Sequence, residues 1–205
     1  MSTDKSRSAL KRSFHFPLVV ALLNACIACL STQEIIRDVK ELQPSGWVYW
    51  QPVEPDVHDF GWGLINANYV DTHDRPSSRQ TAFVRVNRTF LVFGQFTRYV
   101  RPGSHLIEIA DPNSIAVYKS SLRRLTNIKV TGDASESAVF DLSNLPSIAD
   151  TVQVTATTTA PGRRMPDWKQ RNQLLQVSKH DGRKLIETNL YPKSVYTFVV
   201  QGVLR

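Results

Sequence analysis

Residues 87–120 read NRTFLVFGQFTRYVRPGSHLIEIADPNSIAVYKS, and the spacing of their apolar side chains changes partway along. Residues 87–100 repeat apolar side chains with the period of a helix, and Arg101-Pro102-Gly103 ends that helix. From His105 onward, short β-type runs alternate with turn residues. The sequence therefore predicts a mainly β fold that is preceded by a part containing helices.

The β-rich part contains eight predicted strands separated by turn residues such as Asp111-Pro112-Asn113 and His180-Asp181-Gly182. They lie near residues 105–110, 115–119, 125–131, 137–141, 151–158, 173–178, 184–189 and 195–203. Short strands at this spacing favour an antiparallel β-sandwich. We therefore assign residues 104–205 to a sandwich domain.

The helix predicted at residues 87–100 presents one apolar side to its surroundings. That side consists of Phe90, Phe93, Thr97 and Val100, with Phe96 adjacent. Inside a helix, Gly94 costs about 1 kcal/mol relative to alanine. We therefore expect a neighbouring element to pack closely against Gly94.

A second helix is predicted at residues 31–42, and a buried strand follows it directly. The apolar face of this helix consists of Ile35, Ile36, Val39 and Leu42. The strand GWVYWQ, at residues 46–51, is apolar or aromatic on both faces, as in parallel α/β architecture. Residues 52–82 read as a loop. Helix, tight turn and buried strand indicate a barrel fragment or a doubly wound fragment.

The amino terminus has the form of a leader. Of the formal charge of +7, residues 1–12 carry +3, and Phe14 to Leu30 follow without a charged side chain. A basic start before an apolar run is typical of a secretory signal, and the run is short for a membrane span. We interpret residues 1–30 as a signal-like leader or a gene-model artefact, with a buried segment as the alternative. A true leader would make the protein extracellular, and the sequon at Asn87 is then a glycosylation candidate.

Composition excludes several other classes of protein. The basic residues outside the leader are scattered rather than gathered in a stripe, which argues against nucleic-acid binding. Cys26 and Cys29 lie within the apolar run and have no second ligand pair, so they read as small apolar residues. The histidines show no metal-binding spacing. No metal or other cofactor is predicted.

Several segments resemble glycoside hydrolase family 30. EIIRD at 34–38, GWVYWQ at 46–51 and WGLI at 62–65 are similar to the end of that family's barrel. FGQFTRYVRPG at 93–103 resembles its last barrel helix, and PKSVYTF at 192–198 resembles its closing sandwich strand. The nearest match is to the endo-β-1,6-galactanase-like branch.

The resemblance implies a (β/α)8 barrel joined to a sandwich, hydrolysing β-glycosidic bonds with retention. Residues 31–103 would be the terminal fragment of that barrel, whose complete form needs about 250 residues. Both catalytic glutamates would lie upstream of residue 31, so no catalytic residue is predicted in this chain. Trp50 would form the floor of the sugar site, with Gln51 hydrogen-bonding a hydroxyl and Tyr49 beside them.

Acidic residues within the chain do not replace those glutamates in this interpretation. Glu54, Asp56 and Asp59 read as solvated loop acids, and Asp38 as part of a solvated helix face. A lone barrel strand would expose its edges, so we expect the first 100 residues to dock imperfectly on the sandwich or to need a partner.

Three interpretations of function remain open at this point. The first is the carboxyl-terminal portion of a glycosidase whose substrate is a β-linked polysaccharide, and which is inactive alone because both catalytic glutamates are absent. The second is a stand-alone carbohydrate-binding sandwich, whose candidate aromatic side chains are Trp168, Tyr118, Tyr191 and Tyr196. The third is a piece that completes a separately made barrel portion. The oligomeric state is not predicted.

Overall fold

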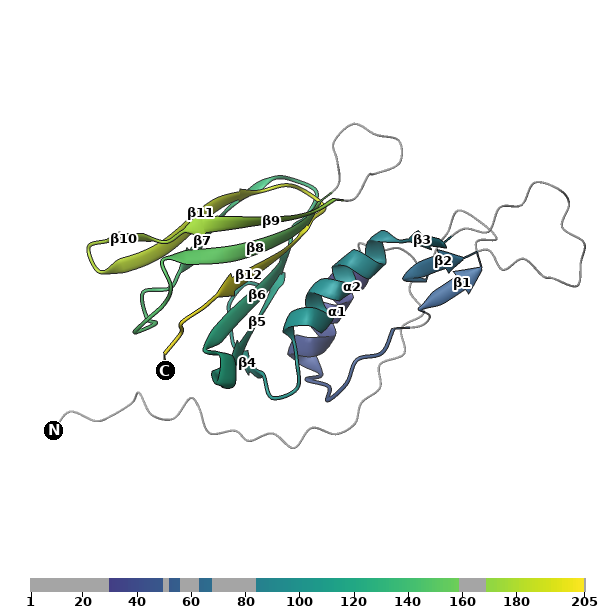
Figure 1. Cartoon of the computed structure of the whole chain (residues 1–205), viewed down its shortest axis with the longest axis horizontal. Coiled ribbons are helices and arrows are strands. Elements are labelled where there is room, and N and C mark those ends of the chain that lie inside the picture. Colours follow the sequence, from purple (N-terminus) through teal and green to yellow (C-terminus); the bar gives the residue numbers. More distant parts are fainter. Residues whose placement is uncertain (1–29, 50–51, 56–62, 68–83, 159–168, 205) are drawn as a thin grey trace, which may run out of the picture.

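The computed structural model describes residues 30–49, 52–55, 63–67, 84–158 and 169–204. Two helices, α1 (Leu30–Glu41) and α2 (Arg88–Tyr99), lie side by side against one face of a β-sandwich. A separate small sheet lies at the far end of the helices (Figure 1). The fold is mainly β with antiparallel sheets in the sandwich, as the sequence predicts.

The sandwich consists of a six-stranded and a three-stranded sheet. The larger sheet has the order β4-β5-β6-β12-β8-β9, and a 3-10 turn, Ser120–Leu122, joins β5 to β6. Its strands are β4 (His105–Ile107), β5 (Ser114–Lys119), β6 (Arg124–Val130), β8 (Thr151–Thr158), β9 (Lys169–Gln176) and β12 (Val195–Val200). The smaller sheet has the order β10-β11-β7, with β7 (Glu136–Asp141), β10 (Ser178–His180) and β11 (Arg183–Leu190).

The strand predicted at residues 173–178 divides between the two sheets. It corresponds to β9, which ends at Gln176, and β10, which begins at Ser178. Val177 between them is 9% exposed and belongs to the sandwich core. One apolar anchor thus fixes the point where the chain passes from one sheet to the other.

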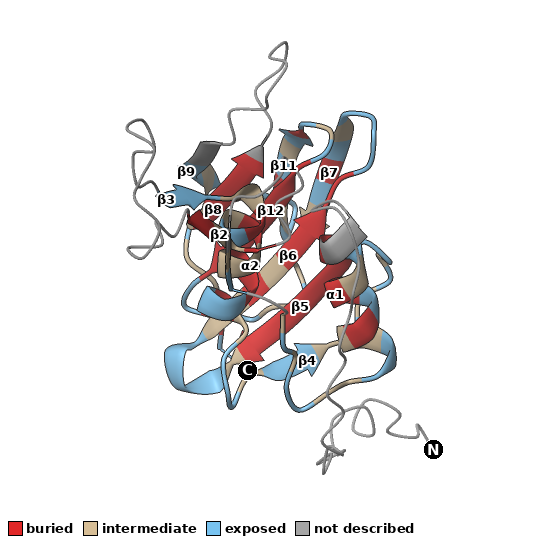
Figure 2. Ribbon diagram, turned by 90° about the vertical axis from the view of Figure 1, so that its right-hand side faces the viewer, coloured by how far each residue is buried: buried red, intermediate tan, exposed pale blue. Residues whose placement is uncertain are grey.

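Strand β12 is buried along its whole length because both of its faces are covered. Tyr196, Phe198 and Val200 point into the core between the two sheets. Val195 packs in the core beneath the helices, and the Thr197 hydroxyl donates a hydrogen bond to Gln95 of α2. Figure 2 shows buried residues along β5, β6, β8 and β12. These strands lie between the two helices on one side and the smaller sheet on the other.

The helices dock on the sandwich through a continuous apolar core. Ile35 and Ile36 of α1, and Phe96 of α2, pack with Ile115 and Ile128 of the larger sheet. All five side chains are at most 5% exposed. The expectation that the first 100 residues dock imperfectly on the sandwich is therefore wrong for α1 and α2.

The predicted apolar side of α2 is only partly its packed side. Phe93 and Val100 pack against the core beneath the helices, whereas Phe90 and Thr97 are exposed. The buried residues of α2 are Thr89, Val92, Gln95, Phe96 and Tyr99. Both sides of the helix carry large apolar side chains, and hydrophobic spacing does not show which of them meets a sheet. No atom lies within 4 Å of a Cβ placed on Gly94, so the close packing expected there is absent as well.

The barrel-like part differs from its prediction. Residues 46–49 form no strand, because none of the described strands pairs with them, and residues 50–51 lie outside the described part. The predicted loop instead contains β1 (Val53–Pro55) and β2 (Ile65–Ala67), which pair in parallel. Strand β3 (Val84–Val86) then pairs antiparallel with β2.

The predicted leader, residues 1–30, falls outside the described residues except for Leu30, where α1 begins. Cys26 and Cys29 lie outside them as well. Among the described helices, none has the length and apolar character needed to cross a membrane.

Candidate functional site

Three aromatic rings meet where α2 passes the segment after α1. The ring centroids of Trp47 and Tyr49 are 6.2 Å apart, and those of Trp47 and Phe93 are 5.7 Å apart. Tyr49 and Phe93 complete the cluster at 5.8 Å. Offset and tilted contacts at such distances stabilise aromatic pairs. The backbone that leads into Trp50 and Gln51 is therefore anchored at Tyr49.

The Trp47 ring is held by a hydrogen bond as well as by packing. Its Nε1–H donates to Oδ2 of Asp38, 3.1 Å away. Asp38 is only 6% exposed, so the expectation of a solvated acid is wrong at this position. The turn after α1 brings Trp47 back over the helix, where the indole covers the carboxylate.

Glu54 is also not the solvated loop acid that the sequence suggests. It lies in β1 as a partly buried residue, and its Oε1 is buried without a hydrogen-bond partner in the described part of the chain. A Cβ on Gly63 would lie 2.9 Å from the Glu54 Cγ, so glycine is needed beside this side chain. Such a carboxylate oxygen is ready to accept a hydrogen bond from an incoming hydroxyl or N–H group.

Glu54 also affects the titration of Tyr49. Burial raises the pKa of the Tyr49 hydroxyl, the nearby Glu54 charge raises it further, and a hydrogen bond with the Thr89 side chain opposes both effects. The phenol therefore stays protonated, and able to donate, beyond its usual pH range. A neutral phenol and a carboxylate thus lie together beside the aromatic cluster.

The predicted sugar-binding residues are only partly within the described structure. Tyr49 is half-buried in the cluster, whereas Trp50 and Gln51 lie outside the described residues. In the described part of the chain, no group of three or more histidine, cysteine, aspartate or glutamate side chains is arranged to hold a metal ion.

The glycosylation candidate Asn87 directly precedes α2. Its Nδ2 donates to the Gly63 carbonyl, 2.8 Å away, and to the Asn66 side chain. Thr89 of the same sequon is 5% exposed. In the folded chain, the nitrogen that would carry a glycan is therefore engaged in joining α2 to β2.

Two of the four aromatic side chains considered for a stand-alone sugar-binding sandwich are core residues. Tyr118 is 6% exposed and Tyr196 is 3% exposed. The Tyr118 hydroxyl donates to the Val203 carbonyl, and the Tyr196 hydroxyl accepts from the Tyr191 N–H at 2.8 Å. Tyr191 is exposed, and Trp168 lies outside the described residues.

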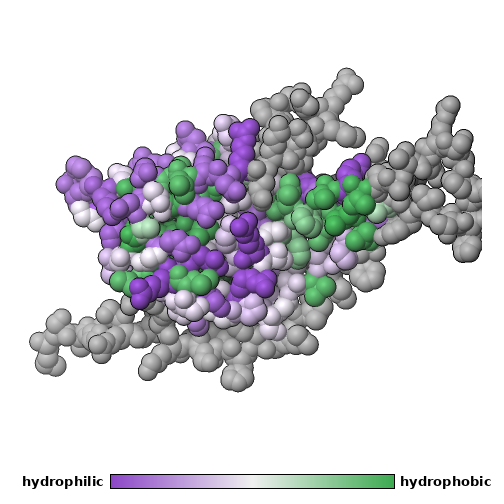
Figure 3. All heavy atoms as spheres, viewed as in Figure 1, coloured by the Kyte–Doolittle hydropathy of each residue, from purple (hydrophilic) through white to green (hydrophobic). Residues whose placement is uncertain are grey.

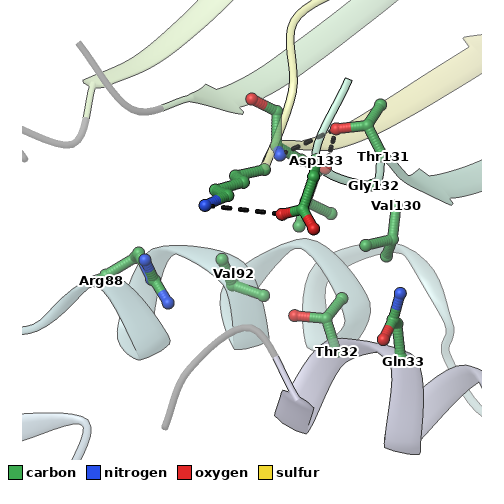
Figure 4. A pocket seen from close by; sticks show the side chains of 11 residues that line it. Thr32, Gln33, Arg88, Val92, Val130, Thr131, Gly132 and Asp133 are labelled. Atoms are coloured by element: carbon green, nitrogen blue, oxygen red, sulfur yellow. Dashed lines mark hydrogen bonds and ion pairs between the residues drawn. The ribbon is translucent and has the colours of Figure 1, made fainter. Parts of the chain in front are cut away.

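A pocket of about 290 Å³ lies elsewhere, between the first turns of the two helices and two sandwich turns (Figure 4). Thr32 and Arg88 line it from the helices, and Thr131, Asp133 and Lys193 from the turns. Lys193 Nζ lies 3.4 Å from Asp133 Oδ1 at the exposed rim. Of the predicted site residues that the structure describes, none lines this pocket. Its walls come from four separate segments that no sequence motif connects.

In sequence, the chain is similar to a curated galactanase. It is 26% identical over 178 residues to an endo-β-1,6-galactanase of Hypocrea rufa, a match that covers 84% of this chain and 32% of the galactanase. The chain thus spans about a third of the length of that curated relative. No family model matches the sequence.

Solved structures show the same fold. The catalytic domain of GH30 xylanase C from Talaromyces cellulolyticus matches 85% of this chain and 35% of its own, with a TM-score of 0.57 and 17% identity. A GH30 endoxylanase from Clostridium papyrosolvens C71 matches 90% of this chain and 41% of its own, with a TM-score of 0.54 and 18% identity. The resemblance to the carboxyl-terminal portion of glycoside hydrolase family 30 is thereby confirmed.

Proposed function

We propose that this chain is the carboxyl-terminal portion of a retaining glycoside hydrolase that acts on a β-linked polysaccharide of the β-1,6-galactan type. The observation that carries the proposal is the sequence match to an endo-β-1,6-galactanase along 84% of this chain. The fold shared with the two GH30 xylanases supports a glycoside hydrolase as the class of enzyme. The match to the galactanase supports a β-1,6-galactan as the substrate.

The contribution of this chain to substrate binding is one wall of the sugar site. Trp50 presents a flat apolar face to sugar C–H groups, and Gln51 hydrogen-bonds a hydroxyl. Both residues follow Tyr49, whose ring packs against Trp47 and Phe93.

In this proposal the chain alone does not hydrolyse the polysaccharide. Retention requires two carboxyl groups about 5–5.5 Å apart, one as acid/base and one as nucleophile. The resemblance puts both glutamates on barrel strands that precede residue 31. Neither step of such a mechanism needs a metal or an organic cofactor. The partner that completes the site is a barrel portion.

The test is an assay of the purified 205-residue chain on β-1,6-linked galacto-oligosaccharides. We expect no turnover, together with weak binding in calorimetry that Trp50→Ala abolishes and Trp168→Ala leaves unchanged. Binding lost in Trp168→Ala but kept in Trp50→Ala would instead establish the stand-alone sugar-binding sandwich. Turnover by the chain alone would refute the loss of catalysis.

The proposal includes secretion, which rests on the basic and apolar residues 1–30. Expression of the complete chain in a eukaryotic host tests it. We expect the protein in the medium with a processed amino terminus. Retention in the cells with Met1 still present would count against a leader.

A further inference from the structure

We propose that the end of α2 and the adjoining β5–β6 turn form a cationic surface that binds the carboxylates of an acidic polysaccharide. The inference rests on the proposed function, because it adds a charge to the class of polysaccharide that the enzyme holds. The cationic surface consists of five basic side chains from separate segments, namely Arg98, Arg101, Lys119, Arg123 and Arg124.

The strand register brings these segments to one end of the larger sheet. His105, at the start of β4, is opposite Tyr118, and the next residue, Lys119, is opposite Arg124 of β6. Strand β4 follows closely after α2, so Arg101 lies in the short connection between them. The end of α2, the start of β4 and the β5–β6 turn therefore meet (Figure 1).

Two backbone carbonyls hold basic side chains at this meeting point. The Lys119 Nζ donates to the Pro102 carbonyl, and a Cβ on Gly103 would lie 2.9 Å from that nitrogen. The Arg101 Nη1 donates to the Thr97 carbonyl, 3.0 Å away. A cation from β5 and a cation from the loop after α2 are therefore both held against the end of the helix.

The Tyr99 ring gathers two guanidinium groups from different elements. The Arg98 Cζ lies 5.5 Å from the ring centroid, and the Arg124 Cζ lies 5.7 Å from it. The ring itself is 5% exposed, and its hydroxyl lies 3.5 Å from the Thr155 Oγ1. Cation–π contact with a fixed ring orders both side chains before a ligand arrives, which lowers the entropy lost on binding.

The cationic surface has no counter-charge of its own. Within the described residues, no carboxylate pairs with any of its five side chains, whereas Lys129, Lys179 and Arg183 each pair with one. The helix dipole favours Arg98 and Arg101 at the end of α2, but it does not account for the three basic residues of the β5–β6 turn. Gathered like charges repel one another, and a bound polyanion relieves that repulsion.

The cationic surface is open to an extended ligand. Arg98, Arg101 and Arg123 are exposed, and Lys119 and Arg124 are half-buried. Figure 3 shows hydrophilic residues where α2 ends against the sandwich, whereas hydrophobic residues gather over the part of α2 beside the small sheet. An open, charged surface of this kind suits a chain of repeated anionic units better than a small molecule.

The chemistry of the side chains favours carboxylates on a polysaccharide. Four of the five are arginines, whose planar fork matches a carboxylate in a bidentate manner. Single-stranded nucleic acid binds best where exposed aromatic rings stack on its bases, and Tyr99 is buried. A lipid surface requires a broad apolar face, and the exposed Leu106 and Leu122 offer only scattered apolar area.

The cationic surface is separate from the aromatic cluster. Tyr49 forms a hydrogen bond with the Thr89 side chain in the first turn of α2, whereas Arg98 lies in the last turn. At the rise of an α-helix, these two positions are about 14 Å apart along the axis. Acidic polysaccharide bound at the end of α2 therefore makes a second contact, away from the residues that follow Tyr49.

The test is calorimetry of the full chain with oligogalacturonate as the acidic probe. We expect binding that weakens as salt is added, because salt screens exposed charges. Arg98→Gln with Arg124→Gln should weaken it by about tenfold or more. The control is Lys179→Gln with Arg183→Gln, which removes the same charge from the smaller sheet and should leave the affinity almost unchanged.

A second pair of substitutions guards against a folding defect. Arg101→Gln with Arg123→Gln leaves both Tyr99 contacts in place and should weaken the binding of oligogalacturonate by a similar factor. Urea denaturation confirms that the variants are folded. Equal affinity of the wild type and these two double variants would overturn the cationic surface, as would the absence of any binding to the wild type.

The remaining outcomes identify another ligand or separate this inference from the proposed function. Tighter binding of single-stranded DNA, or of phosphatidylserine vesicles, than of oligogalacturonate would overturn the inference in favour of nucleic acid or lipid. Trp50→Ala should abolish binding of neutral β-1,6-galacto-oligosaccharide and keep that of oligogalacturonate. Failure of the cationic surface would leave the neutral sugar bound, and failure of the proposed function would leave oligogalacturonate bound.

Discussion

Gln95 on α2 and Thr197 on β12, 102 residues apart in sequence, share a buried hydrogen bond across the helix–sheet interface. The Gln95 Nε2 also donates to Thr157 Oγ1 at 2.6 Å and to the Val195 carbonyl at 3.2 Å. Gln95, Thr157 and Thr197 are at most 1% exposed. A satisfied polar network in an apolar interface fixes one position of the helix on the sheet.

Replacing Gln95 should therefore destabilise the chain strongly. Gln95→Leu leaves the Thr157 and Thr197 hydroxyls buried without their partner, and we expect the free energy of unfolding to fall by about 3 kcal/mol. Urea denaturation measures the change.

The matched control for Gln95 removes all three partners together. Gln95→Leu with Thr157→Val and Thr197→Val should recover most of the lost free energy, because no polar group then remains unpaired. Equal losses in the single and triple variants would contradict a role for this network.

Gly94 offers the opposite change on the same helix. No atom lies within 4 Å of a Cβ added there, and alanine is the better helix former. Gly94→Ala should raise the free energy of unfolding by about 1 kcal/mol. Gly182→Ala is the control, since φ is +76° at Gly182 and the substitution should destabilise the chain. A loss of stability in Gly94→Ala would show that a neighbour occupies this space.

The ion pair of Asp111 with Lys129 should make stability depend on pH. Burial favours a higher pKa for Asp111, but hydrogen bonds from Lys129, Ser114 and the Asn113 backbone, together with the Lys129 charge, outweigh it and lower the pKa. A lowered carboxyl pKa stabilises the fold above the unfolded value of about 3.9. This stability is lost as the pH falls through the folded pKa.

Asp111→Asn should reduce the free energy of unfolding at neutral pH by about 1 kcal/mol, since Asp111 is partly exposed whereas Lys129 is only 8% exposed. The variant should also lose stability less steeply than the wild type in acid. Denaturation at several pH values measures both effects. Asp133→Asn, in an exposed pair with Lys193, should change neither. If Asp111→Asn lost stability in acid as steeply as the wild type, the ion pair with Lys129 would not be the source of the pH dependence.

The effect of the Glu54 charge on the pKa of Tyr49 can be measured directly. Burial first, and then the Glu54 charge, raise the pKa of Tyr49. Glu54→Gln should lower that pKa toward its usual value without reaching it, because burial persists. The readout is tyrosinate absorbance during alkaline titration, with Tyr49→Phe in each background to isolate this residue. The same titration curve in both backgrounds would show that Glu54 does not act on Tyr49.

The sandwich could be read from the sequence, whereas the candidate site could be read only in part. Alternation and turn residues located the strands because these signals are local. Glu54 and Asp38 were misjudged, because what buries them, Gly63 and Trp47, depends on how the chain folds back.

The sequence by itself determined the mainly β class, the turns between the strands and the position of both helices, since backbone periodicity is a property of neighbouring residues. Tertiary structure decided which side of α2 is buried and placed Gln95 on Thr157 and Thr197. It also decided that residues 46–49 form no strand and that the apolar row of Val53, Ile65 and Val86 remains uncovered on β1 and β3. Burial is set by elements distant in sequence, so no local pattern determines it.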